Sequence, residues 1–328
     1  MQVYFEADAD PNLVRSKRIA VLGYGNQGRP QALNLRDSGV TQMRVALRDG
    51  SSSAERARAD GFDVMTPAEA ARWADILVML FPDEEQARVD NDELAPHMKP
   101  GAALVFAHGL AIHFGLIEPR ADLDVVLAAP QGPGTALRDE YLQGSGLLSL
   151  FAVHHDATGS ARALAFSYTA ALGSGRVGML VTSFAEECEA DLFNEQAVLW
   201  GAIPELIHAG FDTLVEAGFS PEVAYLECLT EVKLIADLIH QRGIAGMREA
   251  ISNTAEFGAL KGGDRIITAD TRTEMRRILR EVKNGSFVRD LIADAESGYP
   301  LLESSRAQAR THPIERIGAR LRDLGKSL

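Results

Sequence analysis

The sequence predicts a protein of two parts: a Rossmann-type α/β domain with a doubly wound parallel sheet, followed by an all-helical domain. Two observations support this. In the first half, short apolar strands alternate with helical segments, as in a parallel sheet covered on both faces. Near residue 182 the alternation stops and long helical segments follow. Because 328 residues exceed one typical small domain, we expect domains at 1–182 and 183–328.

The individual elements follow from the hydrophobic pattern and from the positions of Gly and Pro. The expected strands are Arg18–Leu22, Met43–Leu47, Phe62–Met65, Asp75–Leu80, Ala103–Ala107 and Val125–Ala129. The helices expected between the early strands are Pro30–Ser38, Ala68–Trp73 and Glu84–Leu94. In the second half we expect helices at 185–209, 211–218, 221–241, 244–257, 271–284 and 286–297, separated at Gly210, Gly218 and Gly243. The basic tail Arg306–Leu328 is typical of a solvated helix face.

Composition excludes several classes of function. The net charge of −13 would repel nucleic acid and anionic membrane surfaces, and no cluster of Lys or Arg offsets it. No apolar run is long enough for a membrane span, and the acidic first residues lack the pattern of a signal peptide. The two cysteines, Cys188 and Cys228, suit a reducing compartment. We therefore expect a cytoplasmic protein that binds neither nucleic acid nor membrane.

A glycine-rich motif follows the first expected strand directly. It reads Gly23-Tyr24-Gly25-Asn26-Gln27-Gly28, the G-x-G-x-x-G pattern between a strand and a helix. Glycines at these positions permit a tight turn and a close approach of the backbone to a pyrophosphate, which the helix N-terminus attracts. The motif in this setting predicts a dinucleotide-binding domain.

The end of the next strand bears on which dinucleotide is bound. An NAD site usually has an acidic residue there for the ribose 2′-hydroxyl. This chain instead has Arg48, followed by Ser51 and Ser53, and a guanidinium with hydroxyls suits a 2′-phosphate. Asp49-Gly50 would also form a solvated turn without any ligand. We favour NADP over NAD.

Ligands of a doubly wound sheet lie beyond the carboxyl ends of its strands. The loops at that edge contain Pro82-Asp83, His108-Gly109 and Pro130–Gly134. His108 follows an apolar strand directly, so we expect it beside the cofactor as an acid, base or orienting group. A structural histidine bonded to backbone is the alternative.

Two pairs of carboxylates lie on helical faces that are otherwise apolar. Asp191 and Glu195 are four residues apart, as are Glu227 and Glu231, so each pair shares one face of its helix. Like charges that face a core are costly unless a cation neutralises them. Four oxygen donors on two helices suit one or two Mg²⁺ ions. Alternatively, each pair lies at a helix edge and reaches solvent.

Together with these motifs, long segments of the chain resemble ketol-acid reductoisomerase of the short, class I form. They include DLFNEQAVL, EAGFSPEVAYLECL, LIADLI and GIAGMREAISNTAE. The resemblance runs from end to end. It implies conversion of a 2-aceto-2-hydroxy acid to a 2,3-dihydroxy acid, with NADPH and two Mg²⁺, in branched-chain amino acid synthesis. It also implies a knotted helical domain that forms a homodimer or higher oligomer with a shared active site.

The resemblance also implies roles for individual residues. Asp191 would bridge both metals and Glu195 would bind one, while Glu227 and Glu231 would reach the second metal from the partner subunit. Ser252 would contact the substrate carboxylate, and His108 would act in catalysis. The implied NADPH-binding residues are the glycine motif Gly23–Gly28, Arg48, Ser51, Ser53, Asp83, Glu84, Glu85, Gln86 and Gly134.

Several positions depart from the family pattern. Gln131 occupies the position of a lysine, and a neutral amide supplies neither the charge nor the proton of an ammonium. Ala111 stands where the family has Asn, Asn194 where it has Gly, and Arg29-Pro30 where it has His-Ala. These changes surround the expected substrate position, whereas the metal and cofactor residues are kept.

Three functions are therefore compared. The first is a true reductoisomerase whose changes are neutral. The second is a related reductase of a 2-keto acid or imine that no longer isomerises, with Gln131 counted among its altered catalytic residues. The third is a non-catalytic NADPH-binding protein, which the retained carboxylates argue against because they would destabilise a fold without metal.

Overall fold

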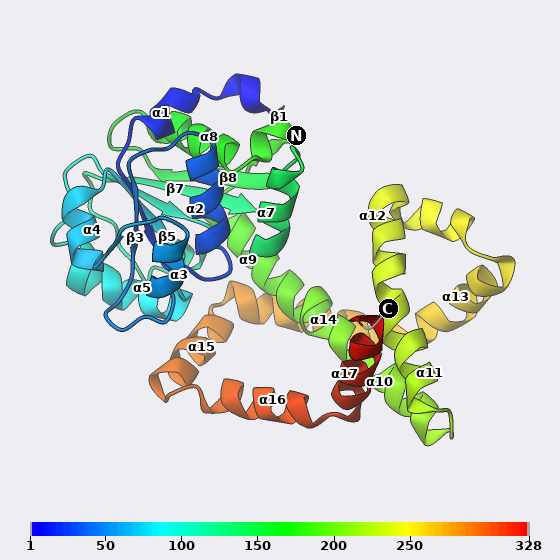
Figure 1. Cartoon of the computed structure of the whole chain (residues 1–328). Helices are drawn as coiled ribbons and strands as arrows, with labels where there is room; N and C mark the ends of the chain where they lie inside the picture. Colours follow the sequence, from blue (N-terminus) through cyan, green and yellow to red (C-terminus); the bar gives the residue numbers. More distant parts are fainter. Residues whose placement is uncertain (1, 327–328) are drawn as a thin grey trace. The chain divides into compact units, whose positions relative to one another are not determined.

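The structure, a computed structural model, describes residues 2–326, with side chains as far as Asp323. Contacts within the chain divide it into two compact units, Met1–Ala190 and Asp191–Leu328. The first is an α/β unit and the second is entirely helical, which confirms the predicted fold class (Figure 1). The division falls within helix α9 (Phe184–Asn194).

A single sheet forms the centre of the α/β unit. Its strands are β1 (Val3–Tyr4), β2 (Ile19–Leu22), β3 (Met43–Ala46), β4 (Val64–Met65), β5 (Ile76–Met79), β6 (Ala103–Phe106), β7 (Asp124–Pro130), β8 (Ser149–His155) and β9 (Met179–Val181). The order across the sheet is β1-β9-β8-β7-β6-β5-β2-β3-β4. The run from β4 to β7 is parallel throughout, and it contains the six predicted strands.

The other three strands make the sheet mixed, which corrects the expectation of a purely parallel one. Strand β8 pairs antiparallel with β7, β9 is parallel to β8, and β1 is antiparallel to β9. An antiparallel extension at the edge of a parallel sheet is common. The hydrophobic pattern does not mark these strands, because β1 and β9 are short and β8 ends in two histidines.

Helices cover both faces of the sheet. Along β2, Ile19 and Val21 face one hydrophobic cluster while Ala20 and Leu22 face the other, as the alternation of a strand requires. The first face packs against α1 (Pro11–Arg15), α2 (Gly28–Asp37), α3 (Ala54–Ala59), α7 (Gly134–Leu142) and α8 (Ala161–Ala171). The second packs against α4 (Pro67–Trp73), α5 (Asp83–Val89), α6 (Leu110–His113) and the start of α9. The layers are therefore helix, sheet, helix (Figure 1).

Strands β2 and β5 lie side by side at the centre of the parallel run. The chain winds from β2 toward β3 and β4 on one side, and from β5 toward β6 and β7 on the other. A crevice opens beyond the carboxyl ends of strands at such a reversal of winding, and it is the usual ligand position of this fold. The glycine motif follows β2 and Asp83 follows β5, so both are at this reversal.

The helical unit continues from α9. Its elements are the π-helical turn η4 (Glu195–Leu199), α10 (Ala202–Glu216), α11 (Pro221–Tyr225), the π-helical turn η5 (Leu226–Thr230), α12 (Glu231–Ala250), α13 (Asn253–Ile266), α14 (Ala269–Lys283), α15 (Ser286–Glu296), α16 (Pro300–Thr311) and α17 (Pro313–Lys326). Helix α17 returns to pack against α11, and Phe211, Ala224, Tyr225, Ile314 and Ile317 form a small buried cluster there.

Of the predicted helix breaks at glycine, those at Gly218 and Gly243 are found and that at Gly210 is not. Gly210 does not end a helix: it lies inside α10, where a side chain would come within 3.2 Å of Cys228 Sγ. The break instead falls at Gly201, where a Cβ atom would lie 1.9 Å from the Gln196 carbonyl oxygen. The predicted break at Gly243 is confirmed by a non-helical conformation (φ 69, ψ 171). The helix predicted over 244–257 is wrong, because the chain leaves the helix after Ala250 and restarts after Ser252.

The arginines of the C-terminal tail, from Arg306 to Arg322, are exposed as expected, but α17 also has a buried side. Ile314 and Ile317 of α17 are 1% and 4% exposed, because α17 buries an apolar stripe against α11. The last two residues of the predicted tail, 327 and 328, lie outside the described residues.

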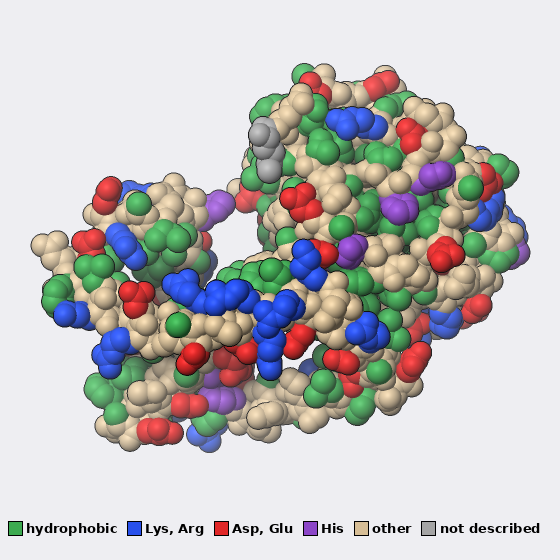
Figure 2. All heavy atoms as spheres, turned by 180° about the vertical axis from the view of Figure 1, so that it is seen from behind, with side chains coloured by type: hydrophobic (Ala, Val, Ile, Leu, Met, Phe, Trp, Pro, Cys, Tyr) green, Lys and Arg blue, Asp and Glu red, His purple; other side chains and the backbone are tan. Residues whose placement is uncertain are grey.

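The helical unit leaves many large apolar side chains exposed. Examples are Trp200 at 65%, Leu234 and Leu260 at 62%, and Leu301 at 71%. Figure 2 shows hydrophobic side chains lying at the surface among charged ones. Extended apolar surface of this kind is typical of an interface with another protein chain. Within residues 2–326, no helix is long and apolar enough to cross a membrane.

A buried carboxyl group marks a third π-helical turn, η2 (Asp90–Leu94), which extends α5. Asp90 is 4% exposed, and its Oδ1 has no hydrogen-bond partner among the described residues. Burial raises the pKa of Asp90 to about 6, and the charge of Arg120 opposes this only in part. The folded protein therefore disfavours the ionised form of this carboxyl group.

We expect Asp90→Asn to stabilise the protein at pH 7.5 but not at pH 4. As the pH rises from about 4 to about 6, the unfolded chain releases this proton while the folded protein retains it, so stability falls and the full penalty remains above pH 6. A shift of this size corresponds to about 1–3 kcal/mol. Denaturant unfolding at both pH values measures the effect, and Asp92→Asn, at an exposed position of the same turn, is the control. Equal effects of Asp90→Asn at the two pH values would contradict this account.

Candidate active site

The glycine motif is folded so tightly that side chains would not fit at two of its positions. A Cβ atom on Gly23 would lie 2.3 Å from the Leu80 carbonyl oxygen at the end of β5, and Gly23 has φ 92. A Cβ atom on Gly28 would lie 2.3 Å from the Gly23 carbonyl oxygen. Gly25 differs, because a Cβ atom there would meet nothing within 4 Å. This open position at the N-terminus of α2 is where a pyrophosphate could approach the backbone.

The side chain of Tyr24, within the same motif, is buried and stabilises the fold. Its ring is 1% exposed and lies edge-to-face with Phe62 at 5.9 Å between centroids. Its hydroxyl donates to Asp60 Oδ2 at 2.8 Å, and Arg29 Nε donates to the same oxygen at 2.7 Å. Only the backbone of Tyr24 is therefore left to meet a cofactor. The ion pair also accounts for Arg29, one of the departures noted above.

A hollow of about 580 Å³ lies beside the loop that follows β3. Its lining includes Arg48, Ser51 and Arg58, together with the acidic side chains Asp49, Glu55 and Glu69. The Glu69 side chain is held by its own helix cap, because its carboxylate accepts hydrogen bonds from the Thr66 N–H at 2.8 Å and the Thr66 hydroxyl at 3.1 Å. These bonds lower the pKa of Glu69.

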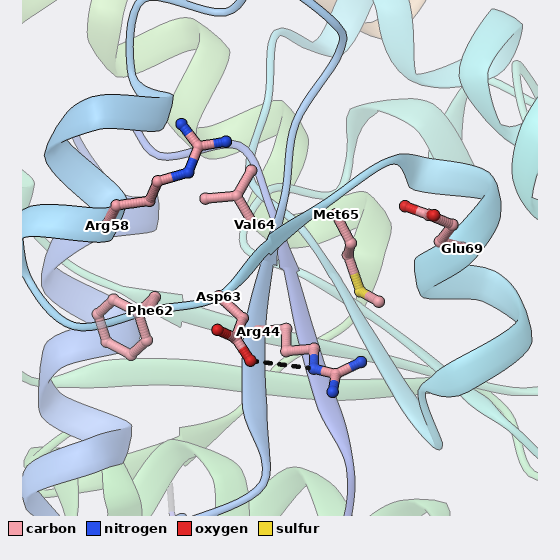
Figure 3. A pocket seen from close by; sticks show the side chains of 7 residues that line it. All are labelled: Arg44, Arg58, Phe62, Asp63, Val64, Met65 and Glu69. Carbon is pink, nitrogen blue, oxygen red and sulfur yellow. Dashed lines mark ion pairs between the residues drawn. The ribbon is translucent and has the colours of Figure 1, made fainter.

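A second hollow of about 590 Å³ shares part of this lining, including Arg58, Val64, Met65 and Glu69. In Figure 3, Arg58 from α3 and Glu69 from α4 lie on either side of Val64 and Met65. The remaining lining residues are Arg44, Phe62 and Asp63, and Arg44 pairs with Asp63 at 3.7 Å. The two hollows together extend from the carboxyl end of β3 along the edge strand β4.

The loops after β5 and β6 are joined by side chains. Asp83 Oδ2 lies 3.4 Å from His108 Nδ1, and Asp83 Oδ1 accepts from the Gln86 amide at 3.1 Å. Gln86 also donates to the Phe81 carbonyl oxygen and is 3% exposed. Asp83 is thus held from one side and holds the His108 ring from the other. Glu84 and Glu85, also predicted to bind the cofactor, occupy the first turn of the same helix.

Glu187 is a site residue that the sequence analysis missed. Its side chain is 4% exposed, and its carboxylate accepts from the Gly109 N–H at 2.7 Å. One of its oxygens lies within 4.8 Å of a ring nitrogen of His108. A Cβ atom on Gly109 would come within 2.4 Å of the Phe184 carbonyl oxygen, so only glycine allows α9 to approach this closely. The signal was present, because Glu187 is one helical turn before Asp191 on α9.

The surroundings of His108 favour its charged form. Burial alone would lower the pKa of His108, but the bonds to Asp83 and Cys188 and the charge of Glu187 outweigh it and hold the pKa well above its usual value. Cys188, one of the two free cysteines, is buried, and burial raises the pKa of its thiol. The side chains around His108 therefore favour its protonated form, and His108 is not a histidine bonded only to backbone.

The loop after β7 packs against the glycine motif. A Cβ atom on Gly134 would lie 1.7 Å from the Asn26 carbonyl oxygen, and the Gln27 amide donates to the Gly132 carbonyl oxygen at 3.0 Å. Gln131 is exposed, and its amide donates to the Ala129 carbonyl oxygen at 3.1 Å. Since β6 and β7 are parallel neighbours, Gln131 and His108 follow adjacent strand ends.

The carboxylate pairs lie beside the π-helical turns of the helical unit. Asp191 is on α9 and Glu195 begins η4; both are partly buried. Glu227 is within η5 and Glu231 begins α12, and both are exposed, as are Leu234 at 62% and Ile235 at 38%. This second face is therefore exposed from Glu227 to Ile235, whereas Ala224, one turn earlier on the same face, is buried.

Ser252 has a local role. It is the N-cap of α13, and its hydroxyl oxygen accepts from the Ala255 N–H at 3.2 Å. The N-terminus of a helix of this length attracts anions such as a carboxylate. This position is compatible with the predicted contact to a substrate carboxylate.

Comparisons with known proteins extend over both units. Residues 13–178 match the family model of the acetohydroxy acid isomeroreductase NADPH-binding domain, and residues 184–326 match that of the ketol-acid reductoisomerase C-terminal domain. The chain belongs to the ketol-acid reductoisomerase family.

Solved structures agree with this assignment. An NADH-preferring ketol-acid reductoisomerase from an uncultured archaeon is 40% identical, with a TM-score of 0.96 and 99% of each chain covered. More distant matches share the fold alone. They include a semialdehyde dehydrogenase NAD-binding protein from Cupriavidus necator (18% identity, TM-score 0.59, 82% of this chain and 99% of that one) and a Plasmodium falciparum pyrroline carboxylate reductase with NADP bound (13%, TM-score 0.51, 83% and 98%).

As a ketol-acid reductoisomerase, the protein is an oxidoreductase that uses a nicotinamide cofactor. It converts a 2-aceto-2-hydroxy acid to a 2,3-dihydroxy acid by alkyl migration and hydride transfer. The similarity over the whole chain favours this activity over a reductase that does not isomerise and over a non-catalytic protein. Two departures from the family pattern, Ala111 and Asn194, have different settings: Ala111 is buried in the core of the α/β unit, and Asn194 ends α9 next to Glu195.

Proposed function

We propose that this ketol-acid reductoisomerase prefers NADPH to NADH, requires Mg²⁺ and completes its active site with a second copy of the chain. The observation that carries the proposal is the contact between His108 and Asp83, 3.4 Å apart, where His108 follows the carboxyl end of β6 and lies beside the acidic helix α9. Bound NADPH would supply the hydride, and Mg²⁺ would supply the Lewis-acid charge for the migration. The chain itself would bind, orient and shield the substrate.

The preference for NADPH is inferred from the loop after β3. Arg48 and Ser51 line the hollow there, and a phosphate accepts hydrogen bonds from cations and hydroxyls of this kind. The acidic side chains of the same hollow oppose this preference, and the related archaeal enzyme is NADH-preferring. Glu69 opposes a bound phosphate least, because its carboxylate already accepts hydrogen bonds from Thr66 at the start of α4.

We expect NADPH to bind at least tenfold more tightly than NADH. Each charge-assisted hydrogen bond to a phosphate contributes about 1.5–3 kcal/mol, and 1.4 kcal/mol is a factor of about ten. Titration calorimetry with both cofactors measures the two dissociation constants. Arg48→Gln should reduce the difference between the two dissociation constants, because it weakens the binding of NADPH alone. Equal constants for the wild type would refute the preference.

The metal proposal rests on the chemistry of the donors. Asp191 and Glu195 offer hard oxygen ligands of the kind that Mg²⁺ requires, and the buried Glu187 lies one turn before Asp191 on α9. Asp191 would bridge two ions and Glu195 would bind one of them. Closely spaced acidic side chains repel one another unless a cation lies between them.

The second copy is inferred from the exposed face around η5. Glu227 and Glu231 lie there among exposed apolar side chains, including Leu226 and Leu234. Apolar surface left uncovered in one chain favours burial against another. We infer that Glu227 and Glu231 of each copy serve the metal site of the other, in a homodimer or a larger assembly.

We expect Mg²⁺ to raise the melting temperature, because an ion that binds only the folded protein stabilises it. Glu231→Gln should weaken this response, because a neutral amide is a poorer ligand for a hard cation. Glu249→Gln, near the end of α12 and beyond its break at Gly243, should leave the response unchanged. Melting curves recorded with and without millimolar Mg²⁺ provide the measurement. A wild-type curve indifferent to Mg²⁺, with or without NADPH, would count against a metal site.

Gln131 bears on the balance between the two chemical steps. Alkyl migration moves charge between oxygens, and fixed positive charge nearby assists it, whereas hydride transfer depends more on the placement of the nicotinamide. The Gln131 amide is turned back to the Ala129 carbonyl and carries no charge. We infer that migration is slower in this protein than reduction.

We therefore expect the wild type to reduce 3-hydroxy-3-methyl-2-oxobutyrate, the migrated intermediate, faster than it converts 2-acetolactate. Gln131→Lys should raise the acetolactate rate, by up to roughly 10²–10³-fold if one electrostatic donor is restored in full. Oxidation of NADPH followed by absorbance measures both rates. Gln143→Lys, at an exposed position at the end of α7, is the control for added charge. If wild type handles both substrates equally and Gln131→Lys changes neither rate, position 131 is dispensable.

A further inference from the structure

Arg56 on α3 joins two loops of the cofactor-binding unit. Its Nη2 donates to the Tyr24 carbonyl oxygen at 2.9 Å and to the Ser53 hydroxyl oxygen at 3.4 Å. Tyr24 belongs to the glycine motif after β2, and Ser53 ends the loop after β3. One guanidinium thus spans the loop expected to meet the pyrophosphate and the loop expected to meet the adenosine ribose.

The Tyr24 end of this bridge is fixed. The Tyr24 ring is buried, and its hydroxyl is bound to Asp60, which Arg29 also holds with bonds of 2.7 and 3.1 Å. Asp60 directly follows α3, the helix that carries Arg56. The carbonyl that Arg56 contacts is therefore part of a rigid frame, and the contact sets the position of the other loop relative to it.

The Ser53 end of the bridge fixes the direction of a hydroxyl group. A hydroxyl has one proton to donate and can accept through its oxygen. The Ser53 oxygen accepts from Arg56, and the Ser51 oxygen accepts from the Ser53 N–H at 3.4 Å. Among the described residues neither hydroxyl donates to a protein acceptor, so both protons remain available to a ligand. A phosphate group, which only accepts, suits two such hydroxyls better than a ribose hydroxyl does.

We propose that Arg56 is a positioning residue for the 2′-phosphate of NADPH, acting through Ser53 and without touching the phosphate. The proposal rests on the proposed use of NADPH. Arg56 holds the loop after β3 against the glycine motif and keeps the Ser53 hydroxyl directed toward the ligand. Loss of the Arg56 side chain should weaken the binding of NADPH, which carries the phosphate, and leave the binding of NADH nearly unaffected.

The test measures dissociation constants for NADPH and NADH by titration calorimetry on the full chain. Arg56→Gln should raise the constant for NADPH by about tenfold, the effect of losing about one oriented hydrogen bond to an anion, and that for NADH by less than about twofold. Arg56→Lys, which keeps the charge and one bond to Tyr24, should recover part of the loss. Arg36→Gln is the matched control, because Arg36 likewise donates to a backbone carbonyl (Asp60, 2.7 Å) and lies over Phe62 but contacts neither loop.

A double-mutant cycle separates an indirect role from direct binding. If Arg56 acts through Ser53, adding Ser53→Ala to Arg56→Gln should raise the dissociation constant for NADPH by no more than about twofold over that of Arg56→Gln alone. Additive losses would mean that Arg56 contacts the phosphate itself and would overturn the proposal. Equal weakening of both cofactors would also overturn it, because that indicates only a structural brace. The wild-type ratio of the two constants tests the use of NADPH, whereas the change in that ratio tests Arg56, so the two proposals can fail separately.

Discussion

At the cofactor-binding edge of the sheet, segments of backbone pack so closely that no side chain would fit between them, and this packing holds the edge together. The glycine motif lies against the end of β5 at Gly23, against itself at Gly28, and against the loop after β7 at Gly134. At each point a single added carbon would lie closer to a carbonyl oxygen than non-bonded atoms allow. The loops that carry His108 and Gln131 follow neighbouring strands of the same sheet, so this packing fixes the frame in which they act.

The parallel half of the sheet could be predicted from sequence, because buried parallel strands are short apolar runs and punctuation by Gly and Pro marks their ends. Predictions failed where a residue's meaning depends on a distant contact. A glycine such as Gly210 usually indicates the end of a helix, yet here it lies within one and leaves room for the Cys228 side chain. Strand β8 has no strong alternation, and its pairing with β7 and β9 makes it a strand. The stripe of α17 was overlooked because its apolar residues alternate with arginines in the sequence.

The candidate site was predictable to a similar degree. Motif residues such as Gly25 and His108 were found because strand ends and glycine spacing specify them locally. Glu187 and Arg56 were not, since a buried glutamate and an exposed arginine on helices are commonplace in sequence and acquire meaning only from their partners. The hydrophobic pattern alone also left open what covers the face of Glu227, because an apolar helical face shows that something covers it, but not whether that is the same chain.

The π-helical turns beside both carboxylate pairs have a consequence for how such helices change during evolution. A π-helical turn holds one residue more than an α-helical turn and is equivalent to an insertion absorbed without breaking the helix. Removing one residue from Glu195–Leu199 would restore a regular helix but rotate all that follows by about 100° relative to Asp191. The same holds for Leu226–Thr230 and Glu231. Substitutions can accumulate along these segments, whereas changes in their length cannot, so chain length here should be more constrained than side-chain identity.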